Sequence, residues 1–429
     1  MRVAYLTAGA GGMYCGSCLR DNALAAALKA RGRDVALFPL YSPIRVDEED
    51  VSEPRVLFGG INVYLQHAAP LAARLTAGVS GLLDHPRLLR AALRRAGSGG
   101  SPQQFGSLAV SVLRGLEGDQ RREVRKLVDG LRPFAPNVVH LPNAMFLGLA
   151  RPLREGLNAA IVCTLTGEDI FVERLSEEHR DACLRLIRAA AGEAHAYICV
   201  SRAYVEYAVE RLGVAAERLH VVPLGVSVTD AAAPAEPSER PFVIGYLARI
   251  CPDKGLHLLC EAFVRLRREG RDARLAIAGY LGAGDRPYWE SCRTVLSRGG
   301  VTERVDFRGE VDRAGKRAFL RSLHVLSVPT AYRDPKGLFV LEALAHGVPV
   351  VQPRHGAFPE LIEATGGGVL HEPRDVGHLA RELARMMDDG EHRRGLGARG
   401  REAVLREFTA ERMAERTWAV FEGAANRAI

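Results

Sequence analysis

The chain has 429 residues, of which 47% are hydrophobic and 25% are charged, the usual balance of a soluble globular protein. This composition excludes a mainly disordered chain, a collagen-like fibre and a small disulfide scaffold, and no stretch reaches the ~20 consecutive apolar residues of a membrane span. The formal net charge of +7 fits either arginines spread over the surface or an anionic partner, and no basic tract with interleaved aromatic residues indicates a nucleic acid.

The first half of the chain alternates short apolar runs with helical patterns. This alternation predicts an α/β domain with a parallel sheet and right-handed crossovers. Helices are expected over Leu19–Arg31 and Arg121–Arg132, and the stretch Ala96–Gly106 is expected to be a surface loop. The expected strands are Val3–Thr7, Asp34–Leu40, Asn62–Leu65, Asn137–Leu141, Ala160–Leu165, Ala196–Ser201 and Leu219–Pro223.

The same rhythm restarts after a segment, residues 230–241, that contains three prolines and no apolar periodicity. Such a segment predicts a linker between two domains, each with its own sheet. The expected strands of the second half are Phe242–Leu247, Arg274–Gly279, Arg304–Gly309, His324–Pro329, Val348–Pro353 and Gly368–His371. The expected division is an N-terminal domain over residues 1–228, a linker over 229–241, a C-terminal domain over 242–408, and a closing helix over 409–429 that packs back on the N-terminal domain.

A glycine-rich turn follows the first strand. Residues Thr7–Gly16 include Gly9, Gly11 and Gly12 and precede a helix, so their backbone N–H groups can approach an anion. The dinucleotide fingerprint G-x-G-x-x-G fails, because Tyr14 stands where its last glycine belongs. No nicotinamide or other cofactor is therefore expected, and a tight structural turn explains the glycines equally well.

Two further features of this half have alternative interpretations. Cys15 and Cys18 stand at a helix start, where a thiol pKa falls and a redox pair can form, but we favour two small residues that pack the glycine turn. Leu82–Ala96 is a basic amphipathic helix that suits either an anionic membrane surface or packing with a solvated arginine face. The eight cysteines show no disulfide or metal-ligand spacing, so we expect a reducing cytoplasm and no metal site.

The second half holds two cations beside a predicted helix start. Arg249 and Lys254 follow the strand Phe242–Leu247 and precede Gly255. Both side chains can converge on one diphosphate, above the N–H groups of the helix that begins there. Two solvated cations are the alternative, which the rarity of lysine in this chain weakens. Further on, Val311 follows a strand and either presents backbone groups to a base or belongs to an ordinary turn.

A second block combines two carboxylates with a glycine. Asp334 and Glu342 stand on either side of Gly337, and Glu342 falls within the apolar helical stretch Leu341–Ala345. A carboxylate that faces a core is costly unless its hydrogen bonds are satisfied. Ligand hydroxyls would satisfy Glu342, and so would a buried arginine.

Together the two blocks resemble the retaining glycosyltransferases of GT-B architecture, family four, whose motif is two glutamates separated by seven residues (E-x7-E). The similarity extends over nearly the whole chain, through the glycine turn, the strand Asn137–His140, the linker and a closing helix near Thr409–Phe421. Asp334 departs from the pattern by replacing the first glutamate, and Lys336 stands where an aromatic or small residue is common. The fold implied is two Rossmann-like α/β domains that face a central cleft.

The resemblance also implies a role for each donor-side residue. Arg249 and Lys254 would grip the diphosphate of the donor, and Glu342 would hold the ribose hydroxyls. The groups near the donor sugar would be Asp334 and the backbone amides of Gly337, Leu338 and Phe339. Gly11 and Gly12 would close over the diphosphate from the other domain.

The acceptor side is expected to follow the strand that ends at Leu165. The family often has a His-Gly pair there, and this chain has Thr166–Gly167. Glu168 and Asp169 are expected to contact the acceptor or the sugar, although Asp169 also fits a helix N-cap. His140 ends a neighbouring strand and either faces the same ligand or belongs to the core.

The sequence therefore predicts a metal-independent, retaining glycosyltransferase. It would move a sugar from a nucleoside-diphosphate sugar to a hydroxyl of a sugar, polysaccharide or lipid-linked sugar, in bacterial carbohydrate or cell-envelope biosynthesis. The reaction would take place in the cytoplasm, with peripheral contact to the inner face of the membrane as an option and no nucleic acid partner. The alternatives are a nucleotide-sugar epimerase or hydrolase on the same architecture, and a non-catalytic sugar-nucleotide-binding protein.

Overall fold

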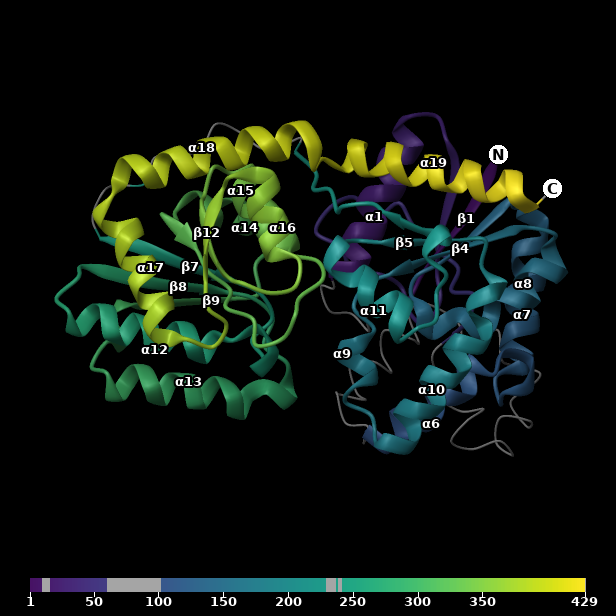
Figure 1. The fold of residues 1–429 in the computed structure, drawn as a ribbon, viewed down its shortest axis with the longest axis horizontal. Coiled ribbons are helices and arrows are strands. Elements are labelled where there is room, and N and C mark those ends of the chain that lie inside the picture. The colour runs from purple at the N-terminus through teal and green to yellow at the C-terminus, as the bar shows by residue number, and fades with distance from the viewer. Residues whose placement is uncertain (10–15, 60–101, 229–236, 238–240, 429) are drawn as a thin grey trace. The chain divides into compact units, whose positions relative to one another are not determined.

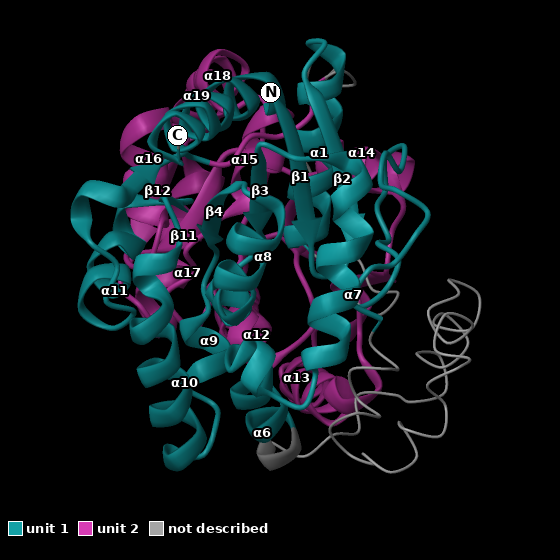
Figure 2. Cartoon of the chain, turned by 90° about the vertical axis from the view of Figure 1, so that its right-hand side faces the viewer, with its two compact units in different colours: residues 1–223, 410–429 teal, residues 224–409 magenta. Residues whose placement is uncertain are grey.

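The computed structural model of this chain describes residues 1–9, 16–59, 102–228, 237 and 241–428. The chain divides into two compact units, unit 1 (residues 1–223 with 410–429) and unit 2 (residues 224–409), coloured teal and magenta in Figure 2. Each unit contains one six-stranded parallel sheet surrounded by helices, so the predicted α/β fold class is confirmed. The expected strand Asn62–Leu65, the amphipathic helix Leu82–Ala96 and most of the expected linker lie outside the described residues.

The sheet of unit 1 has the strand order β2-β1-β3-β4-β5-β6. Every residue of β3, β4 and β5 is buried, as expected for parallel strands covered by helices on both faces. The strands are β1 (Arg2–Thr7), β2 (Asp34–Pro39), β3 (Val138–Leu141), β4 (Ala160–Leu165), β5 (Ala196–Cys199) and β6 (Leu219–Val221).

Helices cover both faces of this sheet. The first helix, α1, and the last, α19, pack against each other, and α19 also lies along β3, β4 and β5 (Figure 1). The described helices of unit 1 are α1 (Gly16–Ala30), α6 (Pro102–Leu113), α7 (Arg121–Leu131), α8 (Ala150–Leu157), α9 (Asp169–Val172), α10 (Glu177–Ala190), α11 (Val205–Glu210) and α19 (Ala410–Ala428). Its 3-10 turns are η2 (Gly115–Glu117), η3 (Arg132–Phe134), η4 (Ala144–Leu149), η5 (Ala191–Glu193), η6 (Arg202–Tyr204) and η7 (Ala216–Arg218).

The start of α6 corrects the sequence prediction. Pro102–Gly106 were expected in a surface loop but form the first turn of this helix. Proline is tolerated there, because the N–H that it lacks has no partner in a first helical turn. Later in the same helix Val112 and Leu113 are buried, so apolar packing of the C-terminal part extends the helix back to the proline.

The sheet of unit 2 has the strand order β12-β11-β10-β7-β8-β9. Its strands are β7 (Phe242–Leu247), β8 (Ala273–Ala278), β9 (Val305–Gly309), β10 (Val325–Leu326), β11 (Val350–Pro353) and β12 (Gly368–His371). Its helices are α12 (Leu256–Arg268), α13 (Arg286–Arg298), α14 (Arg313–Arg321), α15 (Leu338–Ala345), α16 (Phe358–Thr365), α17 (Val376–Asp388) and α18 (Gly390–Glu407). Three 3-10 turns are η8 (Pro252–Lys254), η9 (Ala283–Asp285) and η10 (Thr302–Arg304).

Strand β10 is much shorter than the predicted His324–Pro329. Ser327 still donates its N–H to the Gly245 carbonyl, but its hydroxyl bonds the carbonyl of Val351. Pro329 has no N–H for a ladder, so regular pairing cannot continue through it. The segment that follows is free to form the loop that carries Asp334.

Candidate active site

A buried ion pair lies at the carboxyl edge of the sheet in unit 2. Lys254 ends the turn after β7, and Asp334 stands in the loop after β10, which is the neighbour of β7 in the sheet. The Lys254 Nζ donates to Asp334 Oδ2 at 2.6 Å and to the Tyr332 hydroxyl at 2.8 Å. The rings of Tyr332 and Phe339 both lie within cation–π range of the ammonium. The site therefore holds one lysine charge in a fixed position.

Asp334 is the anchor of this pair. Its side chain is 2% exposed, and its Oδ1 accepts the backbone N–H groups of Lys336 at 3.0 Å and Gly337 at 3.4 Å. Burial acts to raise the pKa of Asp334, but Lys254 and the backbone donors outweigh burial and lower the pKa to about 2. A lowered pKa means that the ionised pair stabilises the fold above about pH 4, and that this stabilisation is lost as the pH falls toward 2.

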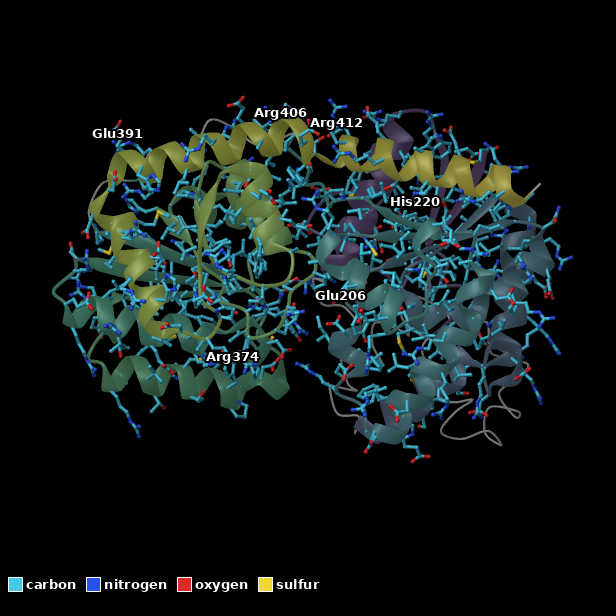
Figure 3. All side chains as sticks on the ribbon, in the orientation of Figure 1. Glu206, His220, Arg374, Glu391, Arg406 and Arg412 are labelled. Carbon is cyan, nitrogen blue, oxygen red and sulfur yellow. The ribbon has the colours of Figure 1, made fainter. Side chains whose placement is uncertain are left out.

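The loop that carries Asp334 is braced from several sides. Ala331 donates its N–H to the Asp253 carbonyl at 2.7 Å, and its own carbonyl accepts a bond from Arg374, which Figure 3 labels. Ala357 donates its N–H to the Asp334 carbonyl at 2.8 Å. A carboxylate on a loop fixed in this way needs little reorganisation when a ligand binds.

Two glycines in the left-handed conformation start the helices beside the ion pair. Gly255 (φ +69°) precedes α12, and a Cβ there would lie 1.8 Å from the Pro329 carbonyl oxygen. Gly337 (φ +62°) precedes α15, where a Cβ would meet Leu361 at 2.5 Å. At the start of α12 the N–H of His257 already bonds the Tyr288 hydroxyl at 3.0 Å. At the start of α15 the N–H groups of Leu338 and Phe339 have no partner among the described residues, which favours an anion there.

Arg249 is the second cation of this edge. It is exposed, and its guanidinium lies 3.7 Å from the sulfur of Cys251. Its charge also acts on the Tyr332 hydroxyl, whose pKa burial and the Asp334 carboxylate raise and Arg249 partly lowers. Tyr246 donates its hydroxyl to the Arg249 carbonyl at 2.9 Å, which fixes the backbone. Lys254 therefore contacts the Tyr332 hydroxyl directly, whereas Arg249 acts on it only through its charge.

Glu342 pairs with a lysine rather than with the buried arginine that was one of the two alternatives. Its Oε1 accepts a bond from Lys316 of α14 at 2.6 Å, and both side chains are about one-fifth exposed. Lys316 and Tyr332 were both missed by sequence reasoning. The signals were present, since Lys316 is one of five lysines and Tyr332 lies two residues before Asp334.

The remaining donor-side predictions divide in two. Gly337, Leu338 and Phe339 lie together at the start of α15, beside the ion pair. Val311 is half-buried just beyond β9. Gly11, Gly12 and Cys15 lie outside the described residues, whereas Cys18 is buried and belongs to no disulfide.

In unit 1, Glu168 is a structural carboxylate. It is 4% exposed, and its two oxygens accept the backbone N–H groups of Ala144, Thr166 and Gly167 at 3.0–3.2 Å. The hydroxyl of Tyr204 donates to Glu168 Oε2 at 3.0 Å. The prediction that Glu168 points to a ligand is not supported, because these donors already occupy both oxygens.

Asp169, unlike Glu168, has a carboxylate oxygen that lacks a hydrogen-bond partner among the described residues. Burial and, to a smaller extent, the neighbouring Glu168 carboxylate raise the pKa of Asp169 to about 6. Its Oδ1 is buried and has no hydrogen-bond partner among the described residues. Asp169 is the first residue of the four-residue α9, and the N-cap position belongs to Glu168, so the N-cap interpretation of Asp169 is wrong.

His140 belongs to the core of unit 1. It is fully buried, its ring stacks on Tyr5 with centroids 3.8 Å apart, and its Nε2 lies 2.6 Å from the Thr164 hydroxyl. Burial, helped by the charge of Arg20, holds the pKa of His140 well below its usual range. Of the two interpretations of this residue, the structure supports the core histidine.

Metal-binding clusters and membrane-spanning helices are both absent from the described residues. They contain no group of three or more histidine, cysteine, aspartate or glutamate side chains arranged to hold a metal ion. Among the described helices, none combines the length and the apolar character that crossing a membrane requires.

Two family models match this chain. The model "Glycosyl transferases group 1" matches residues 229–403, and the model "Glycosyltransferase Family 4" matches residues 104–230. The two matches adjoin and together extend over more than half of the chain.

Curated relatives point to the same family. The chain is 32% identical over 231 residues to the MMP α-(1→4)-mannosyltransferase of Mycolicibacterium hassiacum, which covers 54% of each chain. It is also 32% identical to the GDP-mannose-dependent α-(1-6)-phosphatidylinositol monomannoside mannosyltransferase of Mycobacterium tuberculosis H37Rv. That match extends over 182 residues and covers 41% of this chain and 46% of the relative. The matched stretches span about half the length of these relatives.

Solved structures share the fold over the whole length. Sucrose-phosphate synthase from Thermosynechococcus elongatus matches with a TM-score of 0.71 at 17% identity and covers 100% of both chains. Anabaena Alr3699/HepE in complex with UDP matches with a TM-score of 0.69 at 17% identity and covers 99% of this chain and 100% of that chain. At this identity the likeness shows the fold alone.

Proposed function

We propose that this chain, which belongs to the group 1 glycosyltransferases of family 4, transfers a sugar from a nucleoside-diphosphate sugar to an acceptor hydroxyl with retention of the anomeric configuration. The proposal includes metal independence and the absence of a cofactor. The acceptor class, a sugar, polysaccharide or lipid-linked sugar, follows from the family and from the relatives named above.

The observation that carries the proposal is the way in which Lys254 is held. An ammonium has three N–H donors, and Asp334 and Tyr332 occupy two of them. The third has no partner among the described residues, and Lys254 lies two residues before α12. A diphosphate oxygen bound there would meet the half-buried Lys254, the exposed Arg249 and helix N–H groups, which together would stabilise the charge that develops on the leaving group.

Asp334 and Glu342 take different parts in this proposal. Asp334 is a positioning residue, because its oxygens are occupied by Lys254 and two backbone N–H groups. Glu342 uses Oε1 for Lys316, which leaves Oε2 to accept a ribose hydroxyl. Retention of configuration rests on the resemblance of this carboxylate pair to the E-x7-E motif. On the acceptor side, the unpartnered Oδ1 of Asp169 supports a contact with an acceptor hydroxyl.

We also propose that the reaction takes place in the cytoplasm, with peripheral membrane contact as an option for a lipid-linked acceptor. All seven cysteines that the structure describes are free thiols, which supports a reducing compartment.

A donor screen tests the proposal. The first donors to test are GDP-mannose, which the name of the Mycobacterium tuberculosis relative contains, and UDP-glucose, which is bound in another solved structure of HepE. Thermal stabilisation can detect binding, because a ligand at 100 times its Kd adds about 2.7 kcal/mol to the free energy of unfolding. We expect one donor to raise the melting temperature and to support transfer that survives EDTA, with a product whose anomeric configuration by NMR matches the donor. Turnover without an acceptor would indicate a hydrolase or epimerase. Loss of activity in EDTA with rescue by Mg²⁺ or Mn²⁺ would contradict metal independence.

A further inference from the structure

Unit 1 has a concave site at the amino-terminal edge of its sheet. A pocket of about 420 Å³ is lined by Arg154, Glu193, His195, Glu217 and Arg218, together with Arg427 from the last turn of α19. This volume falls within the roughly 300–1,000 Å³ of small-molecule sites.

The pocket is separate from the acceptor-side carboxylates. His195 directly precedes β5 and Arg218 directly precedes β6, whereas Asp169 follows the carboxyl end of β4. The six residues of β4 span about 20 Å, so the two sites lie at opposite edges of the sheet. A ligand in the pocket would not compete with one at Asp169.

The arginines of the pocket are only partly neutralised. Arg154 pairs with Glu193 at 2.9 Å. Neither Arg218 nor Arg427 forms an ion pair with any residue that the structure describes. Arg218 is nevertheless fixed, because its Nη1 donates to the carbonyls of Gly192 at 2.8 Å and Ala194 at 2.9 Å. Two guanidinium charges therefore line the pocket without a carboxylate partner in the described chain.

His195 adds a directed donor to these charges. Its Nδ1 accepts the N–H of Ile161 at 3.0 Å, so the proton of the neutral ring is on Nε2. The same pocket lining brings Arg154, Arg218 and Arg427 around His195. Burial, followed by these three charges, lowers the pKa of His195, which keeps the ring neutral.

His220, near the same pocket, is also affected by the positive charge of Arg427. It lies on β6, the strand that Arg218 precedes, and it is labelled in Figure 3. Burial and Arg427 lower its pKa as well, and its Nε2 is buried with no hydrogen-bond partner among the described residues.

We propose that this pocket binds a phosphate monoester. A dianionic phosphate would neutralise Arg218 and Arg427, whose planar guanidinium groups match its oxygens, and the Nε2–H of His195 would supply a further hydrogen bond. Glu193 and Glu217 disfavour a polyanion, because an extended chain of phosphates would run against their carboxylates. The phosphate belongs either to a soluble ester or to a lipid headgroup.

Calorimetry on the full chain tests this assignment, with glycerol 3-phosphate as the soluble probe and vesicles that contain phosphatidic acid, whose headgroup is a phosphate monoester, as the lipid probe. Arg427→Ala is the diagnostic variant, because Arg427 is exposed near the end of α19 and its loss should leave the melting temperature unchanged. Arg412→Ala is the matched control: it removes the same charge from the same helix, where Arg412 pairs with Glu415 (Figure 3). The Lys254→Met/Asp334→Asn double variant controls for phosphate bound in unit 2, because it removes the lysine without leaving the Asp334 charge unpaired.

We expect saturable binding of one of the two probes, weakened about tenfold or more by Arg427→Ala and unchanged by Arg412→Ala and by the Lys254→Met/Asp334→Asn double variant. Arg427→Lys should restore part of the affinity. Binding of the soluble ester assigns a free metabolite, and binding of the vesicles alone assigns a lipid headgroup. Absence of binding to both probes would overturn the proposal. So would equal losses in the two arginine-to-alanine variants, since these would indicate a diffuse charge effect. A dependence on Lys254 alone would assign the phosphate to unit 2 and also overturn it.

Discussion

Each unit buries a carboxylate at the carboxyl edge of its sheet, and the two carboxylates are satisfied in different ways. Asp334 of unit 2 pairs with the ammonium of Lys254 at 2.6 Å. Glu168 of unit 1 accepts three backbone N–H groups and the hydroxyl of Tyr204, and its described partners include no cation.

Asp334 therefore positions a charged ammonium group, whereas Glu168 fixes the backbone of a turn. An ion pair keeps a cation with a spare N–H in place, so Lys254 can bind an anion without rearrangement of the site. Neutral backbone donors instead fix the turn around Glu168 and consume its oxygens. The next residue, Asp169, is left as the carboxylate with a free oxygen. Both carboxylates must be compensated for the loss of water, but only the partner of Asp334 is a cation, which suits that site to binding an anionic leaving group.

The largest effect is expected for Lys254→Met, which removes the cation of the ion pair in unit 2. Loss of the lysine leaves the Asp334 charge buried without a cation, so we expect the free energy of unfolding to fall by about 3–5 kcal/mol. Transfer should fall on the order of 10²-fold or more, because the leaving group loses a charge-assisted contact. Urea denaturation and steady-state kinetics measure the two effects.

Two matched variants separate these effects. Lys254→Met with Asp334→Asn should recover most of the stability, since an asparagine oxygen still accepts the N–H groups of Lys336 and Gly337, but it should recover no activity. Arg249→Met removes an exposed cation, so it should lower activity with a stability change within about 0.5 kcal/mol. A Lys254→Met protein as stable as the wild type would show that the pair does not hold Asp334.

Glu168→Gln tests the other carboxylate. The amide group of glutamine would face N–H donors that now meet an oxygen, so we expect the free energy of unfolding to fall by about 1–3 kcal/mol. Nucleotide affinity should stay within twofold, because unit 2 is unchanged. Glu173→Gln, an exposed change at the end of α9, is the control. Weaker nucleotide binding with unchanged stability would contradict the structural role of Glu168.

The smallest expected effect is the pH dependence at Asp169. Its pKa is about 6 in the folded chain against 3.8 for the ordinary carboxyl, so the folded state binds the proton more tightly. This group therefore lowers stability as the pH rises from about 4 to 6. Asp169→Asn should be more stable than the wild type by about 1–2 kcal/mol above pH 6, a value reduced for solvent screening, and equal to it below pH 4. Parallel stability curves for the two proteins would refute the raised pKa.

Sequence patterns predicted the elements of both sheets well. The bounds of β4, β7 and β12 agree with the apolar runs that predicted them, because a buried parallel strand needs a continuous apolar stretch between turn residues. The cation and carboxylate blocks were also found, since each lies in a short motif with its own glycine.

The pairing between those blocks could not be predicted from spacing. Lys254 and Asp334 meet because β10 lies beside β7 in the sheet although β8 and β9 come between them in the chain. Glu168 was expected to face a ligand, but the N–H of Ala144, supplied by the segment after the neighbouring strand β3, satisfies it instead. The order of the strands and the burial of the side chains determine both sets of partners, and a short sequence motif predicts neither property.

Calorimetric titration of a nucleoside diphosphate and of its parent nucleoside tests the central claim, that Lys254 receives the diphosphate of the donor. The wild type is compared with the Lys254→Met/Asp334→Asn double variant, which should remain folded. We expect the double variant to bind the diphosphate at least about tenfold more weakly and the nucleoside with unchanged affinity. An equal change for both ligands, or no change for the diphosphate, would contradict the account.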